Sequence, residues 1–448
     1  MSKTHPPTKT PTTTDIYDIV VIGGGIAGLY TIYRLLQNRP PKTHPHPRIL
    51  LLEQADRLGG RMGSVPFHGA NIAIGAGVGR KHKDRLLLRL LQELDISYQT
   101  TTAHTHYATT IHPQCQVKKT FTQLQKQYRP DRDRHKTFRE YAIEQLGQTD
   151  YEHFIICAGY TDYEQANIQD TLETYGFDDN YGTPFPILSI PWNQVLEALH
   201  QYITHTPHTH TTTIHLNTKV TKIDPRPSLT TPPSDHSLPI YRISTPNHTY
   251  RAHTLVLATT IDTVHRLLPG NPLYQEIRGQ PFLRVYGQFT PECRPLLRTL
   301  CPTTTIVPGP LHKVIPIRPD EGIYMIVYTD NQGATQLQPH TKNTPLNRKT
   351  LAHLLEIALG SPQKLTLTDI RSFYWPIGTH YFTPPPTTTA PPRTRNDFLR
   401  EAQRPFPYSH PHLYIVGEMV SNNQGWVEGA LESVESVLSM ISKSLTKI

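Results

Sequence analysis

The chain has 448 residues, which is long enough for two domains and a sizeable hydrophobic core. Only 36% of its residues are apolar and 42 are proline, so folding requires that the apolar residues be concentrated in blocks. The formal net charge of +8 is not gathered into a basic block or stripe, which argues against a nucleic-acid partner. No apolar run approaches the ~18 residues of a transmembrane helix, so we expect no integral membrane contact.

The beginning of the chain, residues 1–14, is polar and rich in proline and threonine, and we expect a disordered tail rather than a secretion signal. The cysteines are Cys115, Cys157, Cys293 and Cys301. They form no CxxC pair or zinc spacing, so we expect free thiols and a cytoplasmic protein. The histidines between 205 and 215 have no Cys, Asp or Glu partner nearby, and the same His/Thr/Pro bias recurs in other loops. We therefore expect no metal site.

Taken in chain order, residues 15–80 predict a strand, a helix, a second strand and then a loop. Residues 81–200 predict mainly helices, of which 86–94 and 191–203 are the clearest amphipathic stretches. Strands return over 214–260. The predicted strands of 15–80 and the last one of 214–260 are short apolar runs bounded by turn formers. Such runs are typical of a parallel sheet that is buried on both faces.

Residues 280–330 alternate apolar and polar side chains in places, which predicts an antiparallel sheet with one face toward solvent or a cavity. The chain ends in a strand at 413–416 and a helix at 427–445. The predicted fold class combines α/β and α+β architecture. The expected Rossmann-like nucleotide-binding domain is discontinuous and uses three segments, 15–80, 206–262 and 405–448. The expected substrate domain, of mixed sheet and helices, uses the two segments 81–205 and 263–404.

A dinucleotide-binding fingerprint stands at the first predicted strand-to-helix junction. Gly23 permits a sharp turn, Gly25 permits close approach of a pyrophosphate, and Gly28 permits close packing of the helix on the strand. The helix begins at Ile26 and Ala27, whose N–H groups would face the phosphates. A strand before and a helix after the glycines supply the context that this motif requires.

An acidic partner for the ribose, Glu53, follows the second predicted strand. It lies somewhat further along the chain than the usual ~20 residues, because a Pro/His-rich surface loop at 38–47 intervenes. A carboxylate there accepts hydrogen bonds from a ribose diol.

Residues 53–61 (EQADRLGGR) resemble the E-A-x-x-R-x-G-G-R motif of the flavin amine oxidase superfamily. This superfamily includes monoamine, polyamine and L-amino-acid oxidases. The resemblance implies that Gln54, Gly60 and Arg61 bind FAD together with the residues named above, with Arg61 supplying a fixed cation beside the diphosphate.

Further segments resemble the same family in the same order. Gly75 and Ala76 match the small residues that pass beside the flavin, and Val220 matches the valine whose backbone holds the adenine. Near the C-terminus, the sequence "GE" followed by "GWVEGALES" matches the closing motif of the family. The resemblance implies that Glu418 accepts a ribityl hydroxyl and that a helix starting at Val427 points its N–H groups at the flavin.

The chemistry implied by the resemblance is hydride transfer from the carbon alpha to a neutral amine to flavin N5. Trp426 and Tyr381 would form an aromatic slot, with Trp375 lining the same cavity. Arg284 stands where several members carry a lysine near N5, and arginine cannot act as a base. His380 stands where monoamine oxidases carry a flavin-linking cysteine, so we expect non-covalent FAD, with a histidyl link as the alternative.

Three functions remain open from the sequence. The first is an FAD-dependent amine oxidase that uses O2, acts on a small-molecule amine and yields H2O2. The second is a related flavin enzyme, such as a desaturase of the protoporphyrinogen or carotenoid type, because one fold hosts many reactions. The third is a non-catalytic FAD-binding protein. Neither the class of amine nor the oligomeric state follows from the sequence.

Overall fold

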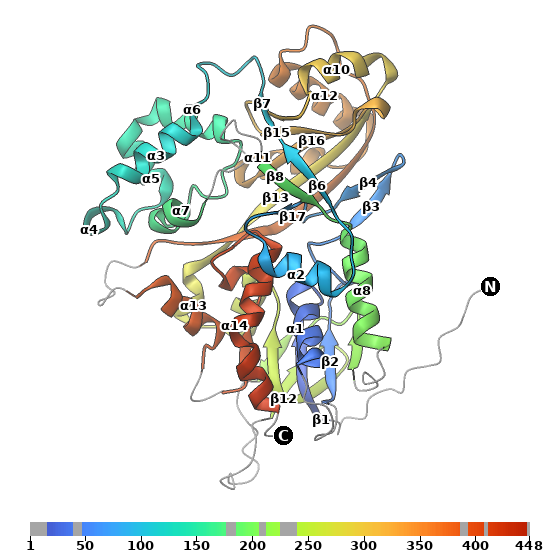
Figure 1. Ribbon diagram of the computed structural model, residues 1–448, viewed down its shortest axis with the longest axis vertical. Coiled ribbons are helices and arrows are strands. Elements are labelled where there is room, and N and C mark those ends of the chain that lie inside the picture. Colours follow the sequence, from blue (N-terminus) through green and yellow to red (C-terminus); the bar gives the residue numbers. More distant parts are fainter. Residues whose placement is uncertain are drawn as a thin grey trace, which may run out of the picture.

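The structure is a computed structural model that describes residues 16–38, 47–175, 185–205, 212–224, 240–385, 393–406 and 411–445. Its lower part is built on a seven-stranded sheet and its upper part on a six-stranded sheet, with a separate group of helices beside the upper sheet (Figure 1). The predicted disordered tail at 1–14 lies outside the described residues, as do His208 and His210 of the histidine-rich loop.

The seven-stranded sheet has the order β10-β11-β12-β1-β2-β9, and β18 also pairs with β12. Its strands are β1 (Ile16–Ile22), β2 (Ile49–Leu52), β9 (Thr212–His215), β10 (Lys222–Asp224), β11 (Tyr241–Ser244), β12 (Thr249–Leu257) and β18 (Leu413–Ile415). Strands β9, β2, β1, β12 and β18 pair in parallel, as the apolar runs predicted. Three distant segments of the chain therefore meet in one sheet.

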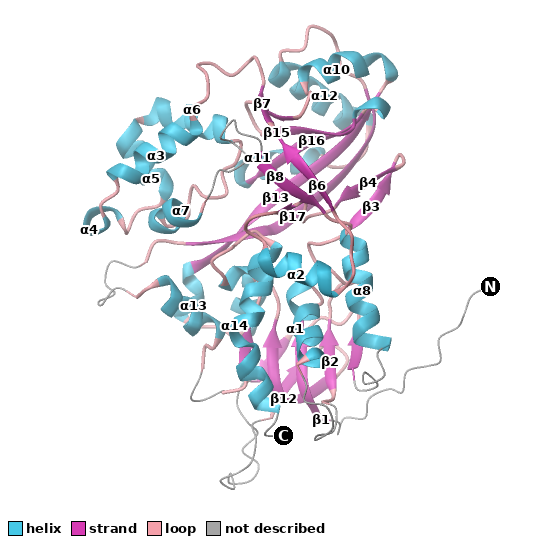
Figure 2. Ribbon diagram, in the orientation of Figure 1, coloured by secondary structure: helices cyan, strands magenta, loops and turns pink. Residues whose placement is uncertain are grey.

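Helices cover both faces of this sheet, and Figure 2 shows those of the near face in front of its strands. One face carries α1 (Ile26–Gln37), α2 (Arg85–Glu93), α8 (Trp192–His205) and α14 (Val427–Leu445); the other carries α9 (Ile261–Leu267) and α13 (Arg395–Gln403). Ile19 and Val21 of β1 are buried in the first core, whereas Val20 and Ile22 are buried in the second. Burial on both faces explains why the strands are apolar without alternation.

The upper sheet has the order β17-β13-β16-β15-β14-β7. Its strands are β7 (Thr105–Tyr107), β13 (Ile277–Phe289), β14 (Thr304–Ile306), β15 (Lys313–Arg318), β16 (Ile323–Asp330) and β17 (Leu367–Phe382). Strand β13 pairs antiparallel with β16 and β17, which confirms the antiparallel prediction. One face packs on α10 (Arg294–Leu300), α11 (Asn331–Leu337) and α12 (Pro345–Leu359).

Strands β13 and β17 extend across both parts of the molecule (Figure 1). Ile277 and Phe382, which pair at one end of this ladder, belong to a core of the seven-stranded sheet. Leu283 and Ile370, further along the same strands, belong to the core of the upper sheet. The two cores are therefore joined by continuous hydrogen-bonded strands.

The remaining elements lie between and beside the two large sheets. The helices α3 (Val117–Gln127), α5 (Phe138–Leu146), α6 (Gln148–Ala158) and α7 (Ile168–Thr174) share a core of their own, and the short α4 (Pro130–Asp133) lies between α3 and α5 in the chain. A hairpin joins β3 (Ser64–Phe67) to β4 (Ala70–Ala73), and a small sheet has the order β5 (Gly79–Arg80), β8 (Phe185–Ser189), β6 (Gln99–Ala103). Short 3-10 helices are η2 (Pro272–Glu276), η3 (Pro291–Cys293), η4 (Pro319–Glu321), η5 (Gln338–His340) and η6 (Glu418–Val420).

Two parts of the secondary-structure prediction are wrong. The stretch before residue 80 was expected to be a loop, but it contains the β3–β4 hairpin. The stretch 81–200 was expected to be mainly helical, yet β6, β7 and β8 interrupt it. Strands β6 and β7 are short and contain no buried residue, so no buried apolar run marks them in the sequence, whereas β8 reads FPILS and is an apolar run that the prediction missed.

The expectation of four free cysteines is wrong for two of them. Cys115 and Cys157 form a disulfide, with their Cα atoms 5.5 Å apart. Packing of the α3–α7 helices brings them together from distant positions, which local spacing in the sequence could not reveal. Cys293 and Cys301 are free and buried.

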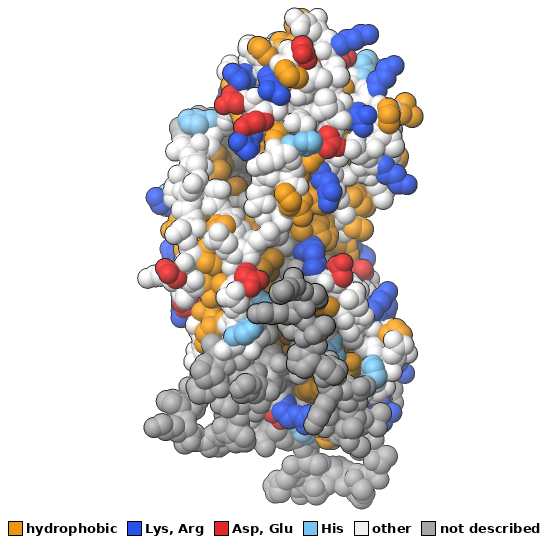
Figure 3. Space-filling model, turned by 90° about the vertical axis from the view of Figure 1, so that its right-hand side faces the viewer, with side chains coloured by type: hydrophobic (Ala, Val, Ile, Leu, Met, Phe, Trp, Pro, Cys, Tyr) orange, Lys and Arg blue, Asp and Glu red, His pale blue; other side chains and the backbone are white. Residues whose placement is uncertain are grey.

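One face of the molecule agrees with the absence of a basic stripe in the sequence. On the face drawn in Figure 3, Lys and Arg side chains lie scattered among polar, apolar and acidic ones. Among the described helices, none combines the length and the apolar character needed to cross a bilayer.

The glycine turn before α1 yields a stability prediction. A Cβ on Gly23 would lie 2.2 Å from the carbonyl oxygen of Ala258, and Gly23 has φ of +110°. We expect Gly23→Ala to lower the free energy of unfolding of the ligand-free protein by at least about 2 kcal/mol, measured by urea denaturation. The matched control is Gly25→Ala, because a Cβ on Gly25 meets no atom within 4 Å. Equal stability of the two variants would contradict this account of the turn.

Candidate functional site

One cavity of about 1190 Å³ extends from the glycine turn of β1 and α1 to the strands of the upper sheet. The predicted site residues that line it are Gly23, Gly25, Ile26, Ala27, Glu53, Gln54, Gly60, Arg61, Gly75, Ala76, Val220, Arg284, Trp375, Tyr381, Glu418, Trp426 and Val427. Gly28 does not line it. A Cβ on Gly28 would lie 2.0 Å from the carbonyl oxygen of Gly23, so Gly28 serves the packing of α1 on β1.

The glycine turn leaves the N-terminus of α1 open to the cavity. Gly25 is the N-cap of α1 and offers no side chain to the helix. The first intrahelical bond runs from the N–H of Leu29 to the carbonyl of Gly25, so the preceding N–H groups have no partner within the helix. Such a helix terminus attracts an anion.

Glu53 follows β2 and is 8% exposed. Its Oε2 accepts from the N–H of Gly24 at 2.6 Å, and its Oε1 accepts from the N–H of Ala55 at 2.7 Å. These two bonds fix the carboxylate at the cavity wall, and each oxygen retains a lone pair for a further donor.

The residues expected near the adenine are arranged less simply. Val220 is buried and lines the cavity, but it precedes β10 instead of lying within it. Its carbonyl oxygen accepts from Nη1 of Arg266 at 2.8 Å. A base that donated a hydrogen bond to the Val220 carbonyl would therefore share that oxygen with Arg266. Gln54 is exposed and lines the cavity beside Glu53.

Arg61 joins the two halves of the cavity. Gly59 and Gly60 have φ of +102° and +54°, so the chain turns sharply here. The N–H of Gly59 donates to the carbonyl of Gly24, which holds this turn beside the glycine turn of β1 and α1. Nη1 of Arg61 then donates to the carbonyl of Gly378 and to Oε1 of Glu418, each at 2.7 Å. A residue after β2 is thus bonded to β17 and to the C-terminal segment.

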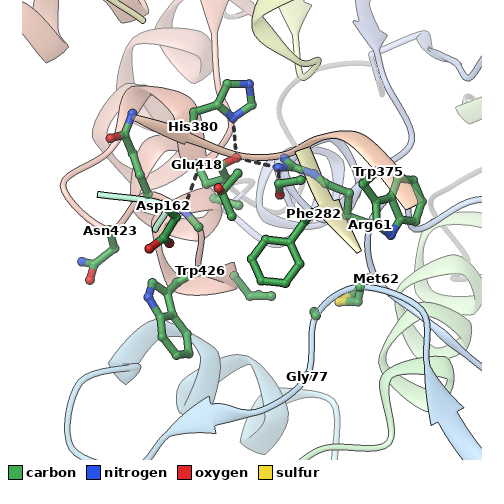
Figure 4. A pocket seen from close by; sticks show the side chains of 18 of the residues that line it. Arg61, Met62, Gly77, Asp162, Phe282, Trp375, His380, Glu418, Asn423 and Trp426 are labelled. Atoms are coloured by element: carbon green, nitrogen blue, oxygen red, sulfur yellow. Dashed lines mark hydrogen bonds and ion pairs between the residues drawn. The ribbon is translucent and has the colours of Figure 1, made fainter. Parts of the chain in front are cut away.

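Glu418 is the most strongly bonded carboxylate of the site (Figure 4). It is 5% exposed and accepts from Arg61, from Nδ1 of His380 at 2.5 Å, and from the N–H of Gly425 at 3.1 Å. Burial alone would raise the pKa of Glu418, but the neighbouring His380 and Arg61 hold it well below its usual range. Glu418 is therefore ionised at neutral pH.

His380 is buried with both ring nitrogens engaged. Its Nε2 accepts from the N–H of Ile261 at 3.2 Å. Because a backbone N–H can only donate, the proton of a neutral His380 lies on Nδ1, where it is donated to Glu418. The sequence identified His380 by its position, but it did not reveal this partner.

The residues present fit a flavin dinucleotide. A Cβ on Gly25 would enter the cavity, so this glycine leaves room for a ligand against the backbone. A Cβ on Gly75 would lie 2.0 Å from the carbonyl oxygen of Arg61, so Gly75 lets two backbone segments meet beside the cavity. The cavity presents three features in the order that an extended dinucleotide needs. They are an open helix terminus, the fixed carboxylates of Glu53 and Glu418, and an aromatic chamber.

The aromatic residues lie at several points of the chamber (Figure 4). Trp375 pairs in register with Phe282 of β13, and its Nε1 donates to the carbonyl of Ile74 at 2.7 Å. Tyr381 pairs with Arg278 further along β17, up to about 20 Å from Trp375 if the strand is fully extended. Trp375 and Tyr381 therefore line separate stretches of the cavity.

One face of Trp426 carries a cation. The guanidinium carbon of Arg80 lies 4.0 Å from the centroid of the Trp426 ring. Arg80 is held there by Asp84 at 2.6 Å and by Oδ1 of Asn423 at 3.0 Å. An ammonium group could not share that face, so only the other face of Trp426 is open to an amine.

Several cavity residues were not identified from the sequence. They are Arg80, Tyr160, Asp162, Phe282, Lys313, Tyr328 and Asn423. For Phe282 and Tyr328 a signal exists, because the alternation along 280–330 predicts one cavity-facing side. For Tyr160 and Asn423, which lie in irregular segments, no local pattern points to the cavity.

Comparisons with known proteins agree with this geometry. The family model described as "Flavin containing amine oxidoreductase" matches residues 136–436, and the model described as "NAD(P)-binding Rossmann-like domain" matches residues 21–94. The chain belongs to the flavin-containing amine oxidoreductase family. It is thus a flavin-dependent oxidoreductase with a Rossmann-like domain, as the motifs predicted.

A crystal structure from Exiguobacterium sp. 255-15, named "Putative protoporphyrinogen oxidase", has a TM-score of 0.64 at 15% identity, covering 95% of this chain and 98% of that one. At this identity the likeness establishes the fold alone, and it confirms the predicted fold class. An uncharacterized protein of Acanthamoeba polyphaga mimivirus is 40% identical over 55 residues. That match covers 12% of this chain and only 10% of the viral protein.

The Glu418 cluster yields a pH-dependent prediction. Glu418→Gln should lower the free energy of unfolding by roughly 3 kcal/mol at pH 7. This loss is at the low end of the range for breaking a buried ion pair, because the Arg61 side chain is 30% exposed. The folded pKa lies below the unfolded value of about 4.3, so the stabilisation is present above pH ~4.3 and is lost as pH falls further. Melting temperatures measured across this range should therefore converge for native protein and variant.

The control is Glu197→Gln on the exposed face of α8. This variant should follow the native protein at every pH. A loss in Glu418→Gln that stays constant down to pH ~3 would contradict the role assigned to the ionised carboxylate.

Proposed function

We propose that this flavin-dependent oxidoreductase binds FAD non-covalently along the cavity and oxidises a small-molecule amine, with O2 as the acceptor and H2O2 as a product. One observation carries the proposal. The cavity is continuous from the open N-terminus of α1 to a chamber lined by Phe282, Trp375 and Trp426. Family membership supports the use of a small substrate and O2.

The chain's own groups would hold the cofactor as follows. The N-terminus of α1 faces the diphosphate together with Arg61, and Glu53 accepts the ribose hydroxyls. Glu418, already ionised and oriented by Arg61, accepts a ribityl hydroxyl. The segments 15–80, 206–262 and 405–448 would form the FAD-binding domain, with the substrate domain formed by 81–205 and 263–404.

Non-covalent binding is supported by the bonds of His380. Both of its ring nitrogens are engaged with protein groups, Nδ1 with Glu418 and Nε2 with Ile261. A histidyl link to flavin would require one of these buried bonds to break, which is costly.

Bound FAD supplies a hydride acceptor for the carbon next to a neutral amine and passes the electrons to O2. The chain contributes the surroundings of the substrate. The free face of Trp426 and the ring of Phe282 supply apolar walls, and Arg80 disfavours an ammonium ion near Trp426. A neutral amine is the form that can donate a hydride, so this repulsion favours the reactive form.

A second candidate is dehydrogenation of a carbon–carbon or carbon–nitrogen bond in a larger anionic substrate, of the protoporphyrinogen type. Eight basic and five acidic side chains are among the described residues that line the cavity. This excess of positive charge favours an anionic substrate. The fold shared with the Exiguobacterium protein supports it only as an architecture.

The decisive test is anaerobic reduction of the FAD-loaded protein by polyamines, monoamines and amino acids. We expect at least one amine to bleach the visible absorbance of the flavin, and O2 to restore it with production of H2O2. Trp426→Ala should keep FAD and slow bleaching by about 100-fold, because substrate positioning is lost. Glu53→Ala and Gly25→Ala should instead lose FAD.

The outcomes separate the three functions. Bleaching by protoporphyrinogen and by no amine would support the second candidate. A yellow protein that no substrate bleaches would indicate a non-catalytic FAD-binding protein. A protein that never retains FAD would overturn the proposal.

A further inference from the structure

Arg284 is a buried cation at the floor of the cavity. Its side chain belongs to β13, where its register partner on β16 is Tyr328, and the residue is only 6% exposed. Its guanidinium rests against Gly77, on which a Cβ would lie 3.0 Å from Nη2. A larger residue at position 77 would crowd the guanidinium, which would have to shift by a few tenths of an ångström.

The partners of Arg284 are neutral. Nη2 lies 3.4 Å from the hydroxyl oxygen of Tyr328, and the guanidinium carbon lies 4.7 Å from the centroid of that ring. Tyr286, whose hydroxyl donates to the carbonyl of Ala73, is its other polar neighbour. Within the described part of the chain, Arg284 forms no ion pair with any carboxylate.

A buried guanidinium without a counter-ion is an unusual arrangement. Buried charges in proteins are normally paired, because removal of a charge from water is costly. Arginine cannot lose its proton to avoid this cost. Arg284 does line the cavity, so an anion placed there would reach it.

A second buried cation lies in the same wall. Nζ of Lys313 is 3.3 Å from the ring centroid of Tyr160, and Lys313 is 1% exposed. The rings of Tyr160 and Tyr328 are 6.0 Å apart, so the two cations flank one pair of tyrosines. Lys313 adds positive potential to the part of the cavity that Arg284 faces.

We propose that Arg284 binds a carboxylate of the substrate, and that Lys313 strengthens this site through its charge. The planar guanidinium can donate two parallel hydrogen bonds to one carboxylate. The ring of Phe282, whose centroid lies 5.0 Å from that of Tyr328, provides an apolar wall next to this site. Among amines the substrate class is then amino acids or other amines that carry an acid group, and unsubstituted polyamines are excluded.

This inference rests on the proposed function only in assigning the cavity to the substrate. It can therefore be tested by binding alone, without turnover. The probe is phenylacetate, and the matched neutral probe is phenylacetamide, which has nearly the same shape. Affinities are measured by calorimetry on the FAD-loaded protein.

The native protein should bind phenylacetate roughly 10- to 100-fold more tightly than phenylacetamide. Arg284→Gln should remove this preference and leave the affinity for phenylacetamide unchanged. Arg284→Lys should restore part of it, and Lys313→Gln should reduce it by a smaller factor. The control is Arg278→Gln, an exposed arginine on the same strand, which should keep the full preference.

Equal binding of the two probes by the native protein would overturn the inference, and this measurement stands even if Arg284→Gln does not fold. A variant that keeps the preference but shifts the reduction potential of the flavin would also overturn it, and would assign Arg284 to the cofactor. Failure of every amine to bleach the flavin would count against the proposed function alone, because carboxylate binding needs no electron transfer.

Discussion

The architecture depends on the hydrogen bonds and ion pairs made by the ionised carboxylate of Glu418. It is bonded to Arg61 from the first βαβ segment, to His380 from the long strand β17, and to Gly425 ahead of the last helix. Three distant stretches of the chain therefore meet at one buried charge. Because such a charge is tolerated only with all its partners in place, it selects the arrangement in which the two sheets enclose a common cavity.

The nucleotide half of the site could be predicted from sequence because its physics is local. Gly23 acts through its own backbone conformation, Gly25 acts through its missing side chain, and Glu53 acts from a fixed position after a buried strand. A short motif is enough to specify such features. The parallel strands were predictable for a similar reason, since burial on both faces leaves continuous apolar runs.

The substrate half depends on register and on packing between distant elements, which no short motif contains. Arg284 was identified by its place in the chain, but its burial against Gly77 and Tyr328 became visible only through the pairing of β13 with β16. Arg80 reaches Trp426 because Asp84, four residues away, and the distant Asn423 hold it there, and Arg80 and Trp426 are far apart in sequence. The disulfide between Cys115 and Cys157 depends in the same way on helix packing.

The strands β13 and β17 give the molecule a continuous backbone from one core to the other. A hinge between the two parts would have to bend a ladder of backbone hydrogen bonds whose side chains are anchored in both cores. Such elements are among the last to open in a folded protein. The framework around the cavity is therefore rigid. Exchange of ligands with solvent depends on side chains and loops at the rim of the cavity.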